Sequence, residues 1–262
     1  MGDTRAKRSR TSGFPLDCPY ALTQEQSSSC KRQLIRRSLV VIDGGSKDGT
    51  VEILKQNSEK IRYWISEPDH GIYHALNKAL GQSHGDWVCL LGADDYLWDS
   101  QVIEQKAPHL ANAFPAVRVG YGQVALVNES GGALGSFGRP WSEMEPVFLT
   151  GEALNIHQAT FHHRSLFEAR GKFVGSFRIA GDYELLLREL RENKVLHVPH
   201  LVTAMQHGGV SSHPSSKATA IREIIQARRM HNLAPSFNLV GAWLRAKMGQ
   251  FCGGGYLQTP DS

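Results

Sequence analysis

Short apolar runs alternate with stretches of helical spacing through the first half of the chain. Residues 39–42 and 61–65 form apolar, β-branched runs that predict buried strands, and a third run follows at 87–91. Between these runs, residues 50–56 and 72–80 place their apolar side chains at helical intervals. Strands that alternate with helices predict a parallel sheet with crossover helices, so we expect an α/β protein.

The second half of the chain shows a weaker pattern. Residues 117–150 combine Gly-rich turns with short apolar runs, which is typical of a meander or hairpin, and Phe161 closes another strand. Three further elements are expected: a helix that opens at Asp182, a late strand over 195–198, and one or two basic amphipathic helices over 216–250.

Composition limits the class of protein. The 262 residues, 41% of them hydrophobic, suffice for one α/β domain, or for a domain with a tail. The four cysteines are scattered and none forms a C-x-x-C pair, which argues against a disulfide framework and against structural zinc. No apolar stretch is long enough to span a bilayer, and the basic N-terminus lacks the apolar segment of a secretory signal. We therefore expect a cytoplasmic protein.

Positive charge gathers at the two ends of the chain. Residues 1–37 and residues 217–250 each carry a net charge of +5, whereas the whole chain carries +4, so the middle is acidic. No nucleic-acid motif accompanies the basic ends and no aromatic residues interleave with their charges, so no nucleic-acid partner is expected. The C-terminal helices suggest a peripheral contact with an anionic membrane surface, and a solvated basic face is the simpler alternative. The residues concerned are Arg222, Arg228, Arg229, Trp243, Arg245 and Lys247.

Two adjacent carboxylates, Asp94 and Asp95, follow the apolar run at 87–91. Ligands of open α/β sheets bind beyond the carboxyl ends of the strands, which is where these side chains are expected. Carboxylate oxygens are hard ligands that suit Mg²⁺ or Mn²⁺ bridging a nucleotide diphosphate. The alternative is a solvated Asp-Asp turn.

A Gly-rich loop, residues 43–50, joins the first predicted strand to the first helix. Its glycines let the backbone approach a ligand, and the amides of the first helical turn favour an anion or a polar ring. Asp43 could accept hydrogen bonds from a ribose or a base. The loop matches neither the Walker A motif nor G-x-G-x-x-G, and a tight turn in which Ser46 or Asp48 caps the helix is an equal alternative.

Polar residues also gather where the chain leaves the second strand. Asp69 is a plausible helix cap, while Tyr73, Asn77 and Lys78 lie off the apolar face of the helix that follows. An ordinary amphipathic helix explains the apolar face but not this cluster.

Two further residues could carry chemistry. Asp182 is expected at the N-cap of its helix, where capping alone would explain it, or it could serve as a general base. His207 precedes two glycines and could complete a metal site in a flexible loop, although an ordinary core or surface imidazole is the simpler interpretation.

Taken together, these segments resemble the family 2 glycosyltransferases of the GT-A fold, in particular the bacterial group that assembles polysaccharides and glycolipids. The resemblance covers residues 38–210 and depends on several motifs in the family's order. These are residues 41–50, 67–78 and 85–95, Tyr121-Gly122, His157-Gln158-Ala159-Thr160-Phe161, and Asp182-Tyr183-Glu184-Leu185.

The resemblance implies a GT-A (Rossmann-like) fold with a mostly parallel central sheet flanked by helices, followed by C-terminal amphipathic helices. It implies an inverting, metal-assisted displacement that moves a sugar from a nucleoside-diphosphate sugar to a saccharide or lipid-linked acceptor. Asp182 would be the general base, and Mg²⁺ or Mn²⁺ would bind Asp95, with His207 as a further ligand. The donor-binding residues would be Asp43, Gly45, Ser46, Asp69, Gly71, Asn77, Lys78 and Asp94.

The same resemblance divides the chain into an atypical basic segment (1–37), a GT-A domain (38–215) and a basic amphipathic helical tail (216–262). The family begins with an apolar strand, whereas Ser9 to Ser12 is polar and Pro15 interrupts the next short run. Either a divergent segment still completes the sheet, or the first nucleotide-binding strand is missing and the chain is a catalytically defective binding or scaffold domain. A nucleotidyltransferase would need a loop after its first strand that is both Gly-rich and basic, and the sequence has none.

Overall fold

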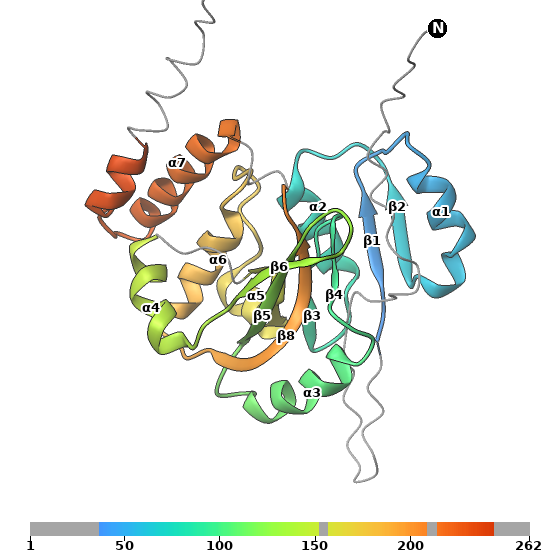
Figure 1. Ribbon diagram of the computed structural model, residues 1–262, viewed down its shortest axis with the longest axis horizontal. Helices are drawn as coiled ribbons and strands as arrows, with labels where there is room; N and C mark the ends of the chain where they lie inside the picture. The colour runs from blue at the N-terminus through green and yellow to red at the C-terminus, as the bar shows by residue number, and fades with distance from the viewer. Residues whose placement is uncertain (1–36, 152–156, 209–213, 244–262) are drawn as a thin grey trace, which may run out of the picture.

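The computed structural model describes residues 37–151, 157–208 and 214–243 (Figure 1). The predicted segment 1–37, apart from its last residue, and the end of the predicted tail with Arg245 and Lys247 lie outside these ranges. The strands are β1 (Val40–Asp43), β2 (Tyr63–Ser66), β3 (Trp87–Cys89), β4 (Asp95–Leu97), β5 (Val119–Val127), β6 (Ala133–Phe137), β7 (Thr160–His163) and β8 (Leu196–Gln206). The α-helices are α1 (Thr50–Gln56), α2 (Ile72–Gln82), α3 (Val102–Ala113), α4 (Trp141–Thr150), α5 (Arg164–Arg170), α6 (Gly181–Leu190) and α7 (Pro214–Met230), with short 3₁₀ turns η1 (Ser58–Lys60) and η2 (His157–Ala159).

The β-α-β-α-β alternation predicted for the first half is confirmed. β1 and β2 pair in parallel, with Val40 opposite Tyr63 and Asp43 opposite Ser66. Helix α1 provides the crossover between them, and α2 follows β2 and packs against β1. The carboxyl ends of β1 and β2 therefore lie together, which brings the two predicted loops to one edge of the sheet.

The larger sheet has six strands. Five follow the order β3-β7-β5-β8-β4, and β6 pairs with the C-terminal part of β5, residues 124–127. Only β5 and β8 run parallel in it, and its other pairs are antiparallel. The expectation of a mostly parallel sheet is therefore wrong for this part of the chain, although the α/β class holds. β5 and β6 are joined by a short hairpin, and a short connection reverses the chain direction.

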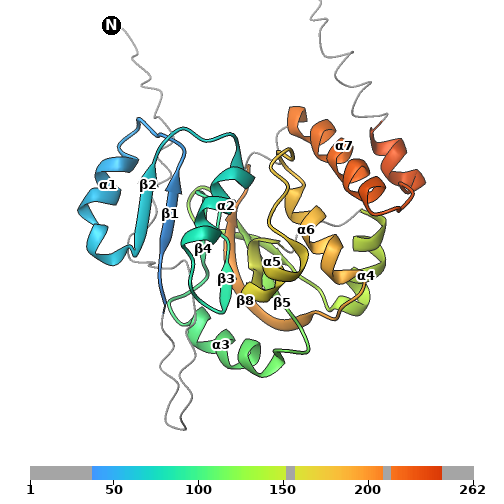
Figure 2. The same cartoon turned by 180° about the vertical axis from the view of Figure 1, so that it is seen from behind.

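The elements are arranged around this central sheet. Both views show β1, β2 and α1 at one side of the molecule and α4, α6 and α7 at the opposite side, with α3 at one end of the central strands (Figures 1 and 2). Helix α6 is the most enclosed helix: Leu185, Leu186 and Leu187 are all buried, and it packs against α5 and α7. A helix that is buried on all sides gives its N-terminal residues a fixed position.

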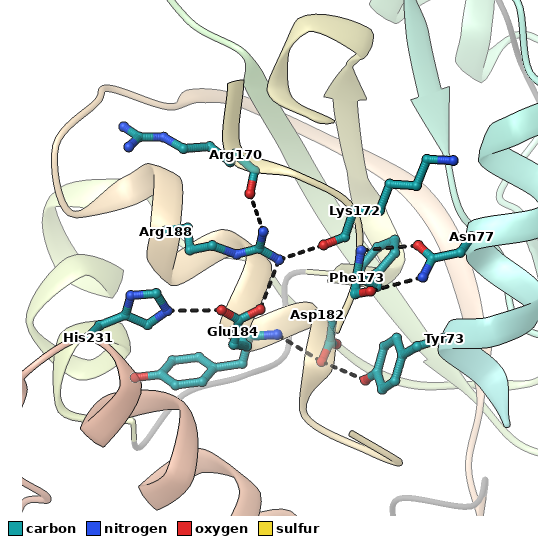
Figure 3. Close-up of polar contacts among 10 residues, drawn as sticks. Tyr73, Asn77, Arg170, Lys172, Phe173, Asp182, Glu184, Arg188 and His231 are labelled. Atoms are coloured by element: carbon teal, nitrogen blue, oxygen red, sulfur yellow. Dashed lines mark hydrogen bonds and ion pairs between the residues drawn. The ribbon is translucent and has the colours of Figure 1, made fainter. Parts of the chain in front are cut away.

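Two charged side chains of α6 are buried and paired. Glu184 binds Arg188 at 2.8 Å and His231 at 2.9 Å, as Figure 3 shows. Glu189 binds Arg118 at 3.0 Å and Arg170 at 2.9 Å. Buried carboxylates need such partners, and here the partners tie α6 to α7, to α5 and to the start of β5.

The basic helix predicted from residue 216 is confirmed as α7, and a further helical turn follows Pro235 within the described residues. One of its predicted surface charges is internal: Arg228 is buried, and its guanidinium donates hydrogen bonds to the carbonyl oxygens of Leu149 and Ala234. The basic face of the helix is therefore smaller than the sequence suggests, with Arg222 and Arg229 exposed on it.

Candidate active site

Asp43 ends β1 and is the acceptor for a set of local hydrogen bonds. Its Oδ2 accepts from the backbone N–H of Gly45 (3.1 Å) and of Ser46 (2.9 Å) and from the hydroxyl of Ser66 (2.5 Å), while the Ser46 hydroxyl donates to Oδ1. Burial raises the pKa of Asp43, but the hydrogen bonds from Ser46 and Ser66 outweigh it, so the net pKa is lowered. The carboxylate is thus ionised and fixed at the sheet edge.

The loop at Asp69 lies directly against the loop at Asp43. Asp69 Oδ1 accepts a hydrogen bond of 2.8 Å from the backbone N–H of Gly71, just before α2. A Cβ added to Gly44 would come within 2.9 Å of Asp69 Oδ2, so the glycine leaves room for this carboxylate where the two loops meet. Gly71 has a φ of 123°, which likewise favours glycine. The structure thus brings together the predicted donor-binding residues of both loops.

Helix α2 carries the polar cluster noted in the sequence. The side-chain amide of Asn77 donates to the carbonyl oxygen of Phe173 (2.9 Å) and accepts from its N–H (3.1 Å), as Figure 3 shows. Lys78 forms an ion pair with Glu67 at 2.5 Å. These contacts fix the segment before α6 and the end of β2. A direct role for Asn77 and Lys78 in donor binding stays a prediction.

Asp94 lies in the turn between β3 and β4, and Asp95 is the first residue of β4. The backbone N–H of Asp95 donates to the carbonyl oxygen of Gly92 at 3.3 Å, and its side chain is buried. Burial, followed by the neighbouring charge of Asp94, raises the pKa of Asp95 to about 6. A buried carboxylate beside a second carboxylate is costly unless a cation joins them, so this pair fits a divalent metal ion.

His207 lies in the turn that follows β8, two residues beyond Met205, which pairs with Asp95. Its backbone N–H donates to the carbonyl oxygen of Val127 at 2.8 Å, and its side chain is exposed. Across residues 37–151, 157–208 and 214–243, no three His, Cys, Asp or Glu side chains gather into a metal-binding group. The metal role of His207 therefore stays a prediction.

Asp182 lies within the first turn of α6 rather than at its cap. The helix begins at Gly181 and its N-cap is Ala180, so the predicted N-cap position is wrong by two residues. Asp182 Oδ1 accepts from the Tyr183 N–H (2.8 Å) and from the Tyr73 hydroxyl (3.1 Å). The Tyr73 hydroxyl also reaches the Ile179 carbonyl oxygen at 2.7 Å.

The second oxygen of Asp182, Oδ2, lies 2.6 Å from Nδ1 of His157. Burial raises the pKa of Asp182, but the charge and the hydrogen bond of His157, with those from Tyr183 and Tyr73, lower it overall. The N-terminal end of the α6 dipole also favours an ionised carboxylate. Asp182 is therefore an ionised side chain held by donors from three elements.

These groups lie close to one another. The charge of His157 lowers the pKa of Asp95 as well as that of Asp182, so His157 lies near both carboxylates. Tyr73 reaches Asp182 from α2, the helix that follows the loop of Asp69. Through His157 and Tyr73, Asp182 is therefore connected with the region of Asp95 and with the helix that follows Asp69.

Sequence reasoning missed Glu223 on α7. Its carboxylate is buried and accepts three backbone N–H bonds, from Arg178 (2.9 Å), Ile179 (2.8 Å) and Ala180 (2.9 Å). These residues directly precede the first turn of α6. The available signal was that Glu223 is the one acidic residue in the basic stretch 217–250.

Comparison with known sequences agrees with this geometry. The model of the sequence family described as "Glycosyl transferase family 2" matches residues 25–126. An uncharacterised glycosyltransferase of Mycobacterium tuberculosis is 31% identical over 180 residues, which cover 68% of this chain and 67% of that protein. The chain belongs to glycosyltransferase family 2.

A second relative of this family 2 glycosyltransferase is a PGL/p-HBAD biosynthesis glycosyltransferase of Mycobacterium bovis. It is 28% identical over 179 residues, which cover 67% of this chain and 64% of that protein. The chain thus aligns with about two thirds of the length of these curated relatives.

Solved structures share the fold at low sequence identity. A mannosyltransferase from Pyrobaculum calidifontis, in complex with GDP-Man and Mn²⁺, matches with a TM-score of 0.55 at 18% identity, over 84% of this chain and 67% of that one. S. aureus TarS in complex with UDP-GlcNAc matches with a TM-score of 0.54 at 15% identity, over 81% of this chain and 64% of that one. The GT-A fold predicted from the sequence is confirmed.

Proposed function

We propose that this family 2 glycosyltransferase catalyses an inverting, metal-assisted transfer from a nucleoside-diphosphate sugar to a hydroxyl of a saccharide or lipid-linked acceptor. The observation that carries the proposal is the difference in surroundings among three carboxylates: donors hold Asp43 and Asp182, whereas Asp95 is buried beside Asp94. Asp43 and Asp182 have lowered pKa values because donors surround them, whereas burial and Asp94 raise the pKa of Asp95. Carboxyl groups whose surroundings give them different pKa values suit different chemical roles.

Asp43 and the loop beside it would bind the nucleoside. Hydrogen bonds from Ser46 and Ser66 hold the Asp43 carboxylate in one orientation, with lone pairs left for ribose hydroxyls or a base N–H. Gly45, with a φ of 86°, lets the backbone turn closely around a ligand. Asp69, Gly71, Asn77, Lys78 and Asp94 complete the proposed donor-binding set.

Asp95 would hold the divalent cation, with Asp94 beside it and His207 at the neighbouring strand end. When bound, Mg²⁺ or Mn²⁺ supplies positive charge that stabilises the leaving nucleoside diphosphate. The relatives' complexes with UDP-GlcNAc, and with GDP-Man and Mn²⁺, support a nucleotide-sugar donor and a divalent ion of this kind.

Asp182 would act at the acceptor. As the acceptor oxygen bonds to the anomeric carbon, its proton passes to Asp182 and the bond from that carbon to the diphosphate oxygen breaks with its electron pair. Displacement from the face opposite the leaving group inverts the anomeric centre. A carboxylate held by three donors can take up this proton without reorienting.

The test begins with calorimetric titration of UDP and of GDP, with and without Mn²⁺, on the full chain. We expect binding that strengthens with Mn²⁺, and its loss in Asp95→Asn but not in Asp99→Asn, an exposed aspartate two residues beyond β4. Release of UDP or GDP from UDP-GlcNAc or GDP-mannose should fall on the order of 10²-fold or more in Asp182→Asn. Absence of nucleotide binding by folded protein would instead support the defective scaffold domain, and full activity of Asp182→Asn would refute its role as base.

The end of α7 supports a second part of the proposal, a cytoplasmic enzyme that contacts an anionic membrane surface. Arg222 and Arg229 are exposed on α7, and Phe237, just beyond it, is 97% exposed. Basic and aromatic side chains together favour the interface of an anionic bilayer. None of the described helices is long and apolar enough to cross a bilayer.

Co-sedimentation of the full chain with vesicles tests this contact. Vesicles that contain phosphatidylglycerol should retain the protein, and pure phosphatidylcholine vesicles should not. The combined variant Arg222→Ala, Arg229→Ala, Phe237→Ser should lose most of the binding, while Lys55→Ala on the distant helix α1 should keep it (Figure 1). Equal sedimentation of all three proteins would refute the contact.

A further inference from the structure

His157 occupies a position that the roles assigned above do not explain. It opens η2, a single turn that contacts both β5 and β8 and leads directly into β7. The next residue, Gln158, donates to the sulfur of Met205 on β8 at 3.1 Å. The imidazole is therefore carried by a turn that is anchored to the central sheet.

The contact between His157 and Asp182 has a specific geometry. Nδ1 of His157 lies 2.6 Å from Asp182 Oδ2, the oxygen that accepts neither the Tyr73 hydroxyl nor the Tyr183 N–H. A proton on Nδ1 can be donated by the neutral imidazole and by the imidazolium alike. The two oxygens of Asp182 are thus held by donors from separate elements, so removal of His157 would take away the donor that contacts Oδ2.

We propose that His157 is the positioning residue for the general base: its Nδ1–H fixes the direction of Asp182 Oδ2 toward the acceptor hydroxyl. This inference rests on the proposed role of Asp182 as the base. The side chain of His157 is 36% exposed and that of Asp182 is 16% exposed, so the pair lies at a partly open surface where an acceptor can approach.

The surroundings of the pair support an orienting rather than a purely packing role. Among the described residues, Asp95, Tyr73 and His162 are other titratable groups that interact electrostatically with it. Burial lowers the pKa of His162 to about 4, and burial raises the pKa of Tyr73, so both are uncharged near neutral pH. These three groups therefore contribute either no charge or the negative charge of Asp95, and His157, with the charge and hydrogen bond that it brings, favours the ionised form of Asp182 more than the Tyr73 hydroxyl does.

Two variants separate orientation from charge. In His157→Asn the amide nitrogen stands the same number of bonds from Cα as Nδ1, so it can donate to Asp182 without carrying a charge. His157→Ala removes both properties. His109→Ala, an exposed histidine on α3, is the matched control.

The first measurement is kcat and KM for release of UDP from UDP-GlcNAc and of GDP from GDP-mannose across pH. We expect kcat of His157→Ala to fall on the order of 10²-fold, with KM for the donor within about threefold of the original, because the loss concerns orientation of a reacting group. His157→Asn should recover most of kcat. Both variants should show the acidic limb of the kcat/KM profile at a higher pH.

The second measurement does not need turnover. The ¹³Cγ resonance of Asp182, assigned with Asp182→Asn, is titrated in the original protein and in His157→Ala, and we expect the pKa of Asp182 to rise by about one unit or more in the variant. An unchanged titration together with an unchanged kcat in His157→Ala would overturn the inference while leaving the base intact. An Asp182→Asn enzyme with full activity would instead overturn the proposed function and this inference with it.

Discussion

Glu223 offers the sharpest test of how the remote helix α7 supports the site. It lies 41 residues beyond Asp182 in sequence, yet its carboxylate accepts the backbone N–H groups of Arg178, Ile179 and Ala180 at 2.8–2.9 Å. These donors belong to the segment that leads into α6, which ends at the N-cap Ala180. Glu223→Ala would leave three of these backbone donors without an acceptor.

The magnitude follows from those bonds. A hydrogen bond to a charged group contributes about 1.5–3 kcal/mol, and three bonds that share one carboxylate do not add fully. We therefore expect Glu223→Ala to lower the free energy of unfolding by about 3–4 kcal/mol. Glu223→Gln keeps one acceptor oxygen but sets an NH₂ group against a backbone N–H, so we expect a loss of about 1–2 kcal/mol.

Urea unfolding followed by tryptophan fluorescence measures these changes through the midpoint at an unchanged m-value. Glu168→Ala is the control, because Glu168 is an exposed side chain in an i,i+4 pair with Arg164 and should change stability by less than about 0.5 kcal/mol. Activity is compared without urea, at a temperature at which all variants are folded. There Glu223→Gln should lower kcat on the order of tenfold, since the loop that it holds leads directly into Asp182.

The reasoning would be refuted if Glu223→Ala unfolded within about 0.5 kcal/mol of the original protein. A large loss of stability with an unchanged kcat would separate the two parts of the argument. Glu223 would then stabilise the junction of α6 and α7 without setting the position of the base.

Three other substitutions test particular features of the structure. Asp95→Asn should abolish the Mn²⁺ effect on nucleotide binding and raise the stability of metal-free protein by about 2 kcal/mol at pH 7.5. The pKa of Asp95 in the folded state is about 6, above the ordinary value of 3.8, so its ionisation destabilises the folded state as the pH rises from 3.8 to 6. At pH 4, where Asp95 is protonated in the folded state, urea curves of Asp95→Asn should show almost no increase in stability. Lys106→Met should raise stability by about 1–2 kcal/mol in the same urea assay, because this lysine is buried and its Nζ has no hydrogen-bond partner among the described residues; a lower midpoint would contradict this. Gly181→Ala should lower kcat with a smaller effect on KM for the donor, since its Cβ would come within 2.8 Å of the Tyr73 ring, and an unchanged kcat would show that Tyr73 does not help to hold the base.

The first half of the fold could be predicted because its signals are local. Each strand there is a short apolar run that ends in a polar loop, and each helix has its own apolar face, so the pattern within a few residues defines β1, α1, β2 and α2. The loops at Asp43 and Asp69 follow from the same pattern, since parallel neighbours place their carboxyl ends together.

The second half was harder to predict because long-range pairing organises it. A late strand was expected over 195–198, but β8 continues to Gln206 because β5 pairs with it on one side and β4 on the other. Pairing with distant strands compensates for the weak local signal. Helices α3, α4 and α5 were not predicted, and Pro108 and Pro146 lie inside two of them.

The residues of the candidate site likewise fall into two groups, those that local motifs indicate and those that only the tertiary structure brings near. Asp43, Asp95 and Asp182 could be proposed from motifs, because each stands at the end or start of a regular element. Their partners could not, since Tyr73, His157 and Glu223 reach Asp182 or its loop from elements that lie far away in sequence. A motif names the group that reacts, and the tertiary structure determines how it is held.

This division has a consequence for Asp182, the proposed base. A carboxylate in the first turn of a buried helix would keep some freedom about its side-chain torsions, and each departure from the reactive direction lowers the rate. Here Tyr73 and the Tyr183 N–H act on one oxygen, His157 acts on the other, and Glu223 holds the backbone that precedes them. Because these restraints come from four different elements, a change in any one leaves the others in place. We therefore expect single substitutions among the partners to reduce the rate by graded amounts, whereas substitution of Asp182 removes the proposed base altogether.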